Sequence, residues 1–284
     1  MLPAINNIFE RLLSGQMYEF YNGLLSDFVG AYRKFYSCET SLQRLTEDWR
    51  MMRDREELVA VVSMDLSKAF GVIKYPLLPS KLRAYGMDDK SCALIRNYLS
   101  SRTQRVKVGD TFSTWQSVNS GVPQGSELFN IFINDLVFHV KKAKLNAYAD
   151  DHQVYYSHVD SAALEACVSH DVGVANQWYH ENGMLVNESK HQGLVLGDAE
   201  YGFSFPVKDT LEIFGIEIDN KVNFSKHISN VCKKINNQFN VMWRFRKLKN
   251  SYGGKSCLNF TKRIFTSFLL VLLCLVLVWS ARCG

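Results

Sequence analysis

Ala147-Tyr148-Ala149-Asp150-Asp151 is the stretch that decides the fold of this chain. Strand-forming segments stand on both sides of it, Lys144-Leu145-Asn146 before and Val154-Tyr155-Tyr156 after. Two adjacent acids between such segments predict a tight β-hairpin with carboxylates at its tip. Neighbouring carboxylates repel each other unless a cation lies between them, so the pair favours a divalent metal. A solvated Asp-Asp turn is the common alternative for an isolated pair.

A third carboxylate, Asp65, stands far upstream in a matching context. It follows Leu58-Val59-Ala60-Val61-Val62-Ser63-Met64, a short and mostly apolar run that predicts a buried strand. An acid at the end of a buried strand is costly unless it is paired or bound to metal. A helical pattern follows, which places Asp65 at a strand-to-helix junction; a helix N-cap is the alternative role. A strand-end acid and a hairpin-tip pair together favour a two-metal phosphoryl-transfer site.

Other segments follow in an order that is specific in combination. Before the acidic pair they are Ala31-Tyr32-Arg33-Lys34, Ser37-Cys38-Glu39-Thr40, Met64-Asp65-Leu66-Ser67-Lys68-Ala69-Phe70, Ser120-Gly121-Val122-Pro123-Gln124-Gly125-Ser126 and Phe129-Asn130-Ile131-Phe132-Ile133-Asn134-Asp135-Leu136. After it come Trp178, Asn182-Gly183-Met184, Asn187, Lys190, Phe214-Gly215-Ile216-Glu217-Ile218-Asp219 and Phe224-Ser225-Lys226-His227-Ile228. With this series the chain resembles the reverse transcriptase domain of a non-LTR retrotransposon, LINE-like and of the jockey type.

The resemblance implies an α+β fold, the right-hand palm of a polymerase, in which an antiparallel sheet packs on helices. Residues 1–57 would be partial fingers, 58–219 the palm with inserted fingers elements, and 220–284 a partial thumb. The implied reaction is RNA-directed DNA polymerisation, the addition of dNTPs to a primer on an RNA or DNA template. The implied cofactor is Mg²⁺, with Mn²⁺ as a substitute, because carboxylate oxygens suit both.

The resemblance also assigns roles to single residues. Asp65, Asp150 and Asp151 would be the catalytic, metal-binding triad. Lys190 would protonate the departing pyrophosphate, with a plain surface lysine as the alternative.

A second group would bind the nucleotide: Leu66, Phe70, Gln124, Gly125, Arg33 and Lys34. Phe70 would exclude a ribose 2′-hydroxyl by its bulk, and the alternative is an ordinary core Phe. Gln124 would contact a base and Gly125 would allow close approach of the backbone, although a turn before a helix also explains the glycine. Arg33 and Lys34 would contact phosphates, or form a solvated basic pair.

Charge is divided unevenly along the chain. Residues 1–219 carry a net charge of −7, whereas residues 220–284 contain 12 Lys and Arg and no acid. Such asymmetry indicates a basic arm that lies on a polyanion. An amphipathic helical pattern there presents Lys233, Lys234, Arg244, Arg246 and Lys247, which we expect to contact nucleic acid. A merely solvated basic face is the alternative.

Periodicity outlines the remaining elements. It predicts helices over 1–26, 76–85, 88–100, 127–140 and 160–181, and strands over 58–66, 193–196 and 211–218. Segments 105–108 and 115–118 read as a hairpin pair. None of the seven cysteines forms a C-x-x-C pair, which argues against zinc. Their odd number and the lack of a secretory leader lead us to expect a reducing compartment, cytoplasm or nucleus. The sequence indicates no protein partner.

Twelve apolar residues run without a break from Phe268 to Trp279. A bilayer span needs roughly 20 residues, so this run is short. Basic residues flank it, which leaves a membrane anchor over 264–281 as a minority interpretation. The other interpretation is a thumb helix that further sequence would cover.

The chain departs from the family in three places. Gly71 stands where the family usually has Asp, and about four residues are missing between Ser126 and Leu128. Four residues are about one helical turn, so this loss would shift the following helix by about 6 Å relative to the nucleotide pocket. We also expect the chain to begin inside the fingers and end in the thumb, with no endonuclease before it, as a fragmentary copy would. The alternatives to an active enzyme are therefore an inactive nucleic-acid-binding remnant and a membrane-associated fragment.

Overall fold

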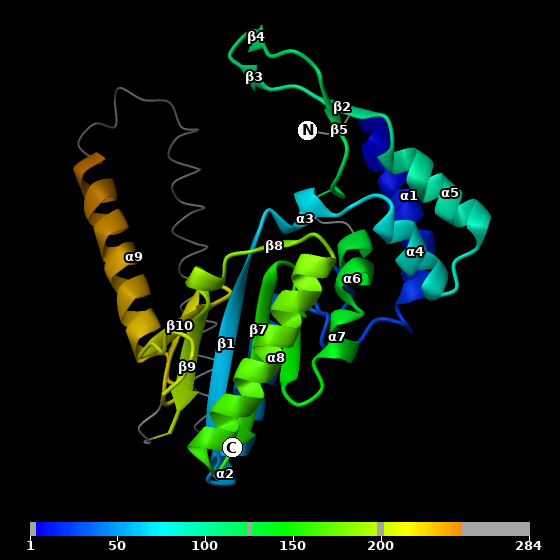
Figure 1. Ribbon diagram of the computed structural model, residues 1–284. Helices are drawn as coiled ribbons and strands as arrows, with labels where there is room; N and C mark the ends of the chain where they lie inside the picture. The colour runs from blue at the N-terminus through cyan, green and yellow to red at the C-terminus, as the bar shows by residue number, and fades with distance from the viewer. Residues whose placement is uncertain (1–3, 124–126, 198–201, 246–284) are drawn as a thin grey trace.

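The computed structural model describes residues 4–123, 127–197 and 202–245 (Figure 1). A five-stranded sheet forms its centre, in the order β6-β7-β1-β8 with β9 also paired to β1. Every pairing in this sheet is antiparallel. Its strands are β1 (Leu58–Ser67), β6 (Lys144–Tyr148), β7 (Asp151–His158), β8 (Leu185–Val186) and β9 (Gln192–Leu196). The predicted strands over 58–66 and 193–196 and the acidic hairpin are confirmed.

Helices surround the sheet and carry most of the connections. They are α1 (Ala4–Tyr21), α2 (Cys38–Asp54), α3 (Ala69–Val72), α4 (Leu77–Ala84), α5 (Asp89–Leu99), α6 (Glu127–Ile133), α7 (Leu136–His139), α8 (Ser161–Glu181) and α9 (Ser225–Phe245). Local sequence sets several of their starts, because Ser37 and Thr40 form a capping box on α2 and Asp160 caps α8. The helices predicted over 76–85, 88–100 and 160–181 are confirmed.

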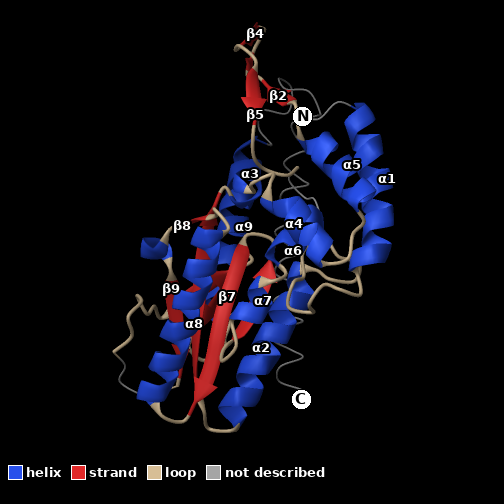
Figure 2. Ribbon diagram, turned by 45° about the vertical axis from the view of Figure 1, so that its right-hand side comes forward, coloured by secondary structure: helices blue, strands red, loops and turns tan. Residues whose placement is uncertain are grey.

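The two faces of the sheet bury different cores. Along β1, Ala60 and Val62 pack with α8 on one face, whereas Val59 and Val61 pack with α2 on the other. Side chains alternate between the faces of a strand, so a continuous apolar run such as β1 is what a strand buried on both faces requires. Figures 1 and 2 show α8 and α2 on these faces. The arrangement is the α+β palm that the motifs predicted.

One predicted helix is divided. The expected helix over 127–140 was wrong, because α6 ends at Ile133 and α7 begins at Leu136. Between them, Asn134 is fully buried, accepts a hydrogen bond from the Ser26 amide at 2.8 Å and donates to Leu24 O and Tyr85 Oη. These tertiary hydrogen bonds compete with continuation of the helix.

The strand predicted over 211–218 was also wrong as a single element. It is a hairpin of β10 (Thr210–Ile213) and β11 (Ile216–Asp219), which turns at Phe214 and Gly215. Both turn residues have positive φ, 53° and 79°, as a tight hairpin turn requires.

A second hairpin region projects away from the sheet in both ribbon views. Its strands are β2 (Arg102–Gln104), β3 (Lys107–Val108), β4 (Thr111–Phe112) and β5 (Gln116–Val118). The prediction paired 105–108 with 115–118, but β5 pairs with β2 and β3 pairs with β4. Gly109, whose φ is +58°, lies in the turn between β3 and β4. This turn reverses the chain sooner after residue 108 than the predicted pairing with 115–118 required.

No helix within the described ranges is long and apolar enough to cross a membrane. The apolar run over 264–281 lies outside the described residues.

Candidate active site

The strand register brings the predicted carboxylates to one end of the sheet. Asp65 on β1 lies directly opposite Asp151 on β7, and Asp151 lies opposite Tyr148 on β6. Directly paired residues of antiparallel strands share a face. Asp150 lies in the β6–β7 turn and is exposed, and Ala149 before it has φ 54°. The fold therefore joins Asp65 and Asp151, which lie 86 positions apart in the sequence.

The acids repel one another at this end of the sheet. Burial by the surrounding protein raises the pKa of the Asp151 carboxyl, and the charges of Asp150, Asp65 and Glu212 raise it further. Desolvation and like charges both disfavour the ionised form. A cation at this position would relieve the repulsion.

Lys190 is the side chain that meets the acids. It ends a short 3₁₀ turn (Glu188–Lys190), and its Nζ lies 3.3 Å from Asp65 Oδ2. Both side chains are largely exposed, so the pair contributes little to stability. The structure thus brings Lys190 to the acidic end of the sheet, and its catalytic role stays a prediction.

The donor set suits a hard divalent cation, because carboxylate oxygens are the ligands that Mg²⁺ and Mn²⁺ prefer. Besides burial, the negative charges of neighbouring acids raise the pKa of Asp151, and a divalent cation would neutralise those charges. Within the described residues, however, no three His, Cys, Asp or Glu side chains are grouped so as to hold an ion. The triad's metal-binding role stays a prediction.

Phe70 lies in α3, just beyond the acidic end of β1. Its ring packs against Phe129, with ring centroids 4.3 Å apart, and against Tyr32, with centroids 6.0 Å apart. Burial raises the pKa of Tyr32, and the charge of Asp150 adds to the effect, so this aromatic group lies near the carboxylates. The side chain of Leu66 is buried in the core, and its main chain pairs with Val186 on β8.

Arg33 and Lys34 have different surroundings. Arg33 is buried, and its guanidinium donates to the main-chain oxygens of Ser26 at 2.7 Å and Val29 at 2.9 Å. This engagement fixes a loop and argues against a free phosphate contact or a solvated side chain. Lys34 is exposed, with its Nζ 5.2 Å from the centre of the Phe35 ring.

Gln124 and Gly125 lie outside the described residues, but the segment that leads to them is fixed. Gly121 donates its amide to Ile73 O and Val122 donates to Phe70 O, each at 2.8 Å. Gly121 has φ +90°, and a Cβ there would lie 2.8 Å from Gly71 Cα. The backbone approach therefore requires glycine at 121, whereas a Cβ at Gly71 would meet nothing within 4 Å.

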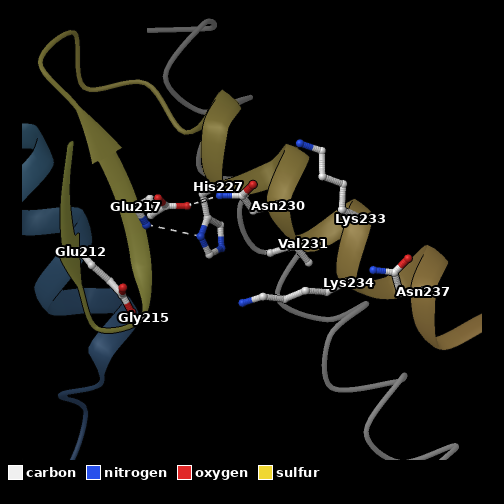
Figure 3. A pocket seen from close by; sticks show the side chains of 9 residues that line it. All are labelled: Glu212, Gly215, Glu217, His227, Asn230, Val231, Lys233, Lys234 and Asn237. Atoms are coloured by element: carbon white, nitrogen blue, oxygen red, sulfur yellow. Dashed lines mark hydrogen bonds between the residues drawn. The ribbon is translucent and has the colours of Figure 1, made fainter. Parts of the chain in front are cut away.

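A pocket lies between the β10–β11 hairpin and α9 (Figure 3). Lys233 and Lys234 line it, together with Glu212 and Glu217 of the hairpin. Figure 3 shows Lys234 extending across the pocket toward the hairpin, whereas Lys233 extends upward in the view, in a different direction. The facing acids were not predicted, because only the fold brings hairpin and helix together. Glu212 also raises the pKa of Asp151, so this pocket lies near the carboxylates.

Hydrogen bonds fasten the start of α9 to the hairpin. Asn230 Nδ2 donates to Glu217 Oε2 at 2.5 Å, and the Glu217 amide donates to His227 Nδ1 at 3.3 Å. The Asn230 hydrogen bond lowers the pKa of Glu217, and burial lowers the pKa of His227. Of the other predicted basic residues, Arg244 lies within α9, and Arg246 and Lys247 lie outside the described residues.

Comparison with known proteins identifies the class. A family model described as reverse transcriptase (RNA-dependent DNA polymerase) matches residues 4–218, so the chain belongs to the reverse transcriptase family. The resemblance to non-LTR elements is confirmed by two Drosophila melanogaster relatives. The RNA-directed DNA polymerase from mobile element jockey is 22% identical over 252 residues, which are 81% of this chain and 27% of that protein. The probable RNA-directed DNA polymerase from transposon BS is 27% identical over 170 residues, 55% of this chain and 19% of that protein.

The chain thus spans about a quarter or less of the length of these relatives. Among solved structures, it is similar to telomerase from Candida tropicalis in complex with the TWJ fragment of telomeric RNA. The TM-score is 0.51 at 12% identity, over 81% of this chain and 41% of that chain. At this identity the likeness concerns the fold, and it agrees with a polymerase palm.

Proposed function

We propose that this chain is the nucleotidyl-transferring part of a retrotransposon reverse transcriptase, which adds dNTPs to a primer on an RNA or DNA template. The observation that carries the proposal is the register of β1 and β7, which sets Asp65 opposite Asp151 beside the Asp150 turn. Membership of the reverse transcriptase family supports the same chemistry. Residues 1–57 would serve as fingers, 58–219 as palm and 220–284 as thumb.

Asp65, Asp150 and Asp151 would hold Mg²⁺, or Mn²⁺ in its place. The bound ions would supply electrostatic stabilisation of the phosphoryl group in transfer. Lys190 already lies against Asp65, from which it could hold a proton for the departing pyrophosphate. A metal ion and the Lys190 ammonium would compete for the same carboxylate oxygen of Asp65. We therefore expect the Lys190–Asp65 ion pair to break when Mg²⁺ or Mn²⁺ binds.

The neighbouring residues would bind the nucleotide and the nucleic acid. Phe70, with Tyr32 and Phe129 behind it, would limit room at the sugar 2′ position. The main chain at Leu66, together with Gln124, Gly125 and the exposed Lys34, would contact the nucleotide. The basic residues of the thumb, Lys233, Lys234, Arg244, Arg246 and Lys247, would contact backbone phosphates of primer and template.

Primer extension on an RNA template tests this proposal, with purified full-length chain, Mg²⁺ and the four dNTPs. We expect extension by the wild-type chain and its loss on Asp150→Asn, which removes a ligand charge while keeping the side-chain shape. Asp110→Asn is the matched control, since Asp110 is an exposed acid on the β3–β4 hairpin. Folded wild-type chain that extends no primer with Mg²⁺ or Mn²⁺ would overturn the enzymatic proposal.

A second candidate function is that of an inactive nucleic-acid-binding remnant. The shortened sequence between Ser126 and Leu128 favours it, because a displaced helix beside the nucleotide pocket would impair positioning. Salt-dependent binding of a primer–template duplex without extension would support this candidate, and extension would exclude it.

A further inference from the structure

His152 follows the acidic pair directly and points the opposite way. Asp151 shares a face of the sheet with Asp65, whereas His152 pairs with Met64, whose side chain packs in the core beneath α8. His152 is fully buried. A buried imidazole is retained at low cost only when both nitrogens are hydrogen-bonded.

Both nitrogens of His152 have partners. Nε2 lies 2.9 Å from the carbonyl oxygen of Ala149, and Nδ1 lies 2.5 Å from the hydroxyl oxygen of Tyr179 on α8. A carbonyl oxygen only accepts, so Nε2 carries the proton and Nδ1 accepts from the Tyr179 hydroxyl. Full burial disfavours a charged imidazole, so the ring is neutral in this tautomer.

The Ala149 carbonyl belongs to the turn that presents the carboxylates. Ala149 has φ 54°, a left-handed conformation that a residue with a Cβ adopts reluctantly. The His152 Nε2–H donates to this carbonyl across the turn, and Asp150 and Asp151 are the two residues between Ala149 and His152. A hydrogen bond at this point fixes the peptide orientation on which the direction of Asp150 depends.

Tyr179 connects this hydrogen bond to a rigid element. It is fully buried near the end of α8, and its carbonyl accepts the Met184 amide at 2.8 Å. Its ring packs edge-on against Trp178, with ring centroids 5.5 Å apart. The hydroxyl that meets His152 is therefore held by the helix that covers this face of the sheet.

We propose that His152 and Tyr179 are a positioning pair, which holds the Asp150–Asp151 turn from the face opposite the carboxylates. Neither residue touches substrate or metal, so their role is to set the geometry of the acids through the Ala149 carbonyl. This inference rests on the proposed metal-binding function of the three acids. Positioning groups behind metal ligands commonly affect metal affinity by about 10- to 100-fold.

Three substitutions in the full chain separate the two hydrogen bonds. Gln at 152 can place its amide nitrogen where Nε2 lies and keep the donor to Ala149, whereas Asn at 152 reaches only the Nδ1 position. Tyr179→Phe removes the hydroxyl alone. Tyr156→Phe on β7 is the matched control, because none of the described residues forms a hydrogen bond with its hydroxyl and its ring is partly buried in the same core.

Mn²⁺ binding, followed by electron paramagnetic resonance, is the first measurement. We expect His152→Asn and Tyr179→Phe to weaken Mn²⁺ binding by about tenfold, and His152→Gln and Tyr156→Phe to stay within about twofold of the wild-type chain. In primer extension, the Mg²⁺ concentration for half-maximal rate should rise with unchanged KM for primer–template. Equal Mn²⁺ affinity in the wild-type chain, His152→Asn and Tyr179→Phe would overturn the inference.

Hydrogen exchange of residues 149–152 is the second measurement, and it needs no activity. We expect faster exchange in this segment in His152→Asn and Tyr179→Phe, with exchange in α2 unchanged. If the wild-type chain binds no Mn²⁺, the proposed function fails, while this measurement still decides the positioning pair. Unchanged exchange in the segment would overturn it, and if Tyr179→Phe does not fold, the Gln-to-Asn contrast at 152 decides.

Discussion

At the residue scale, the negative charge that makes Asp151 a candidate metal ligand also lowers the stability of the folded chain. Its raised pKa means that the folded chain holds this proton more tightly than the unfolded chain does. Its contribution to stability is therefore fully present below the ordinary Asp pKa and is lost as pH rises through the raised, folded-state pKa. A metal-binding role for Asp151 would depend on its negative charge, and the protein around it does not offset the repulsion between that charge and the neighbouring acids.

Asp151→Asn should therefore stabilise the metal-free chain at pH 7. Because the side chain keeps contact with solvent, we expect the melting temperature to rise by only about 1–3 °C. Calorimetry in EDTA measures the difference, which should shrink toward pH 3 and on addition of Mg²⁺ to the wild-type chain. A lower melting temperature for Asp151→Asn in EDTA at pH 7 would contradict the proposed repulsion.

Asp171 on α8 is a buried acid with a structural task. Its Oδ2 accepts the amides of Lys142 at 2.8 Å and Ala143 at 2.7 Å, at the entry to β6. Asp171→Ala should lower the free energy of unfolding by about 2–4 kcal/mol, because the buried amide of Ala143 and the partly buried amide of Lys142 lose their acceptor. Asp171→Asn keeps one acceptor oxygen and should cost less. Urea denaturation measures both, with the exposed Asp209→Ala as control; equal stability of Asp171→Ala and wild type would refute this role.

At the element scale, prediction succeeded where the signal is local. The strand before Asp65 and the helix over 160–181 are encoded in runs and caps, and the acidic hairpin in its flanking strand formers. Prediction failed where a distant partner decides. The break after Ile133 depends on hydrogen bonds between Asn134 and a loop more than 100 residues away.

The candidate site likewise contains residues that the sequence predicted and residues that it did not. The motif order indicated the three acids and Lys190, but periodicity carries no information about register, so the opposition of Asp65 and Asp151 needed the fold. Glu212 and the His152–Tyr179 pair were missed, since each acts across a tertiary contact. His152 lies in a strand of mixed polar and apolar residues, so the sequence carried no signal for its burial against Tyr179.

Two glycines near α3 make a matched test at this scale. Gly121→Ala should destabilise the chain by about 1–3 kcal/mol, because φ is +90° and the new Cβ would lie 2.8 Å from Gly71 Cα. Gly71→Ala should stay within about 0.5 kcal/mol of wild type, since its Cβ meets open space. Urea denaturation of both variants compares them directly. Equal effects would mean that the close approach of the two segments is not maintained in solution.

At the scale of the whole molecule, the chain separates its charges. The net charge is −7 over residues 1–219, and no acid occurs among residues 220–284. Where α9 meets the palm, however, basic side chains face Glu212 and Glu217 of the hairpin. The hairpin acids reduce the positive potential on that side of the helix, so the two neighbouring lysines are not equivalent.

Lys233 should therefore contribute more to nucleic-acid binding than Lys234. Lys234 extends across the pocket toward the hairpin acids, and its charge helps to lower the pKa of His227, whereas Lys233 extends upward in the view (Figure 3). Each lysine that neutralises one phosphate adds about 0.9 to the slope of log affinity against log salt. We expect Lys233→Gln to lower this slope by about 0.9 on a primer–template duplex of any sequence, and Lys234→Gln to lower it by less.

Fluorescence anisotropy over a salt series measures both, with the exposed Lys90→Gln on α5 as control. Equal slopes for wild type and Lys233→Gln would show that this face of α9 does not contact phosphate, and a larger loss at Lys234 would show that nucleic acid enters the pocket instead.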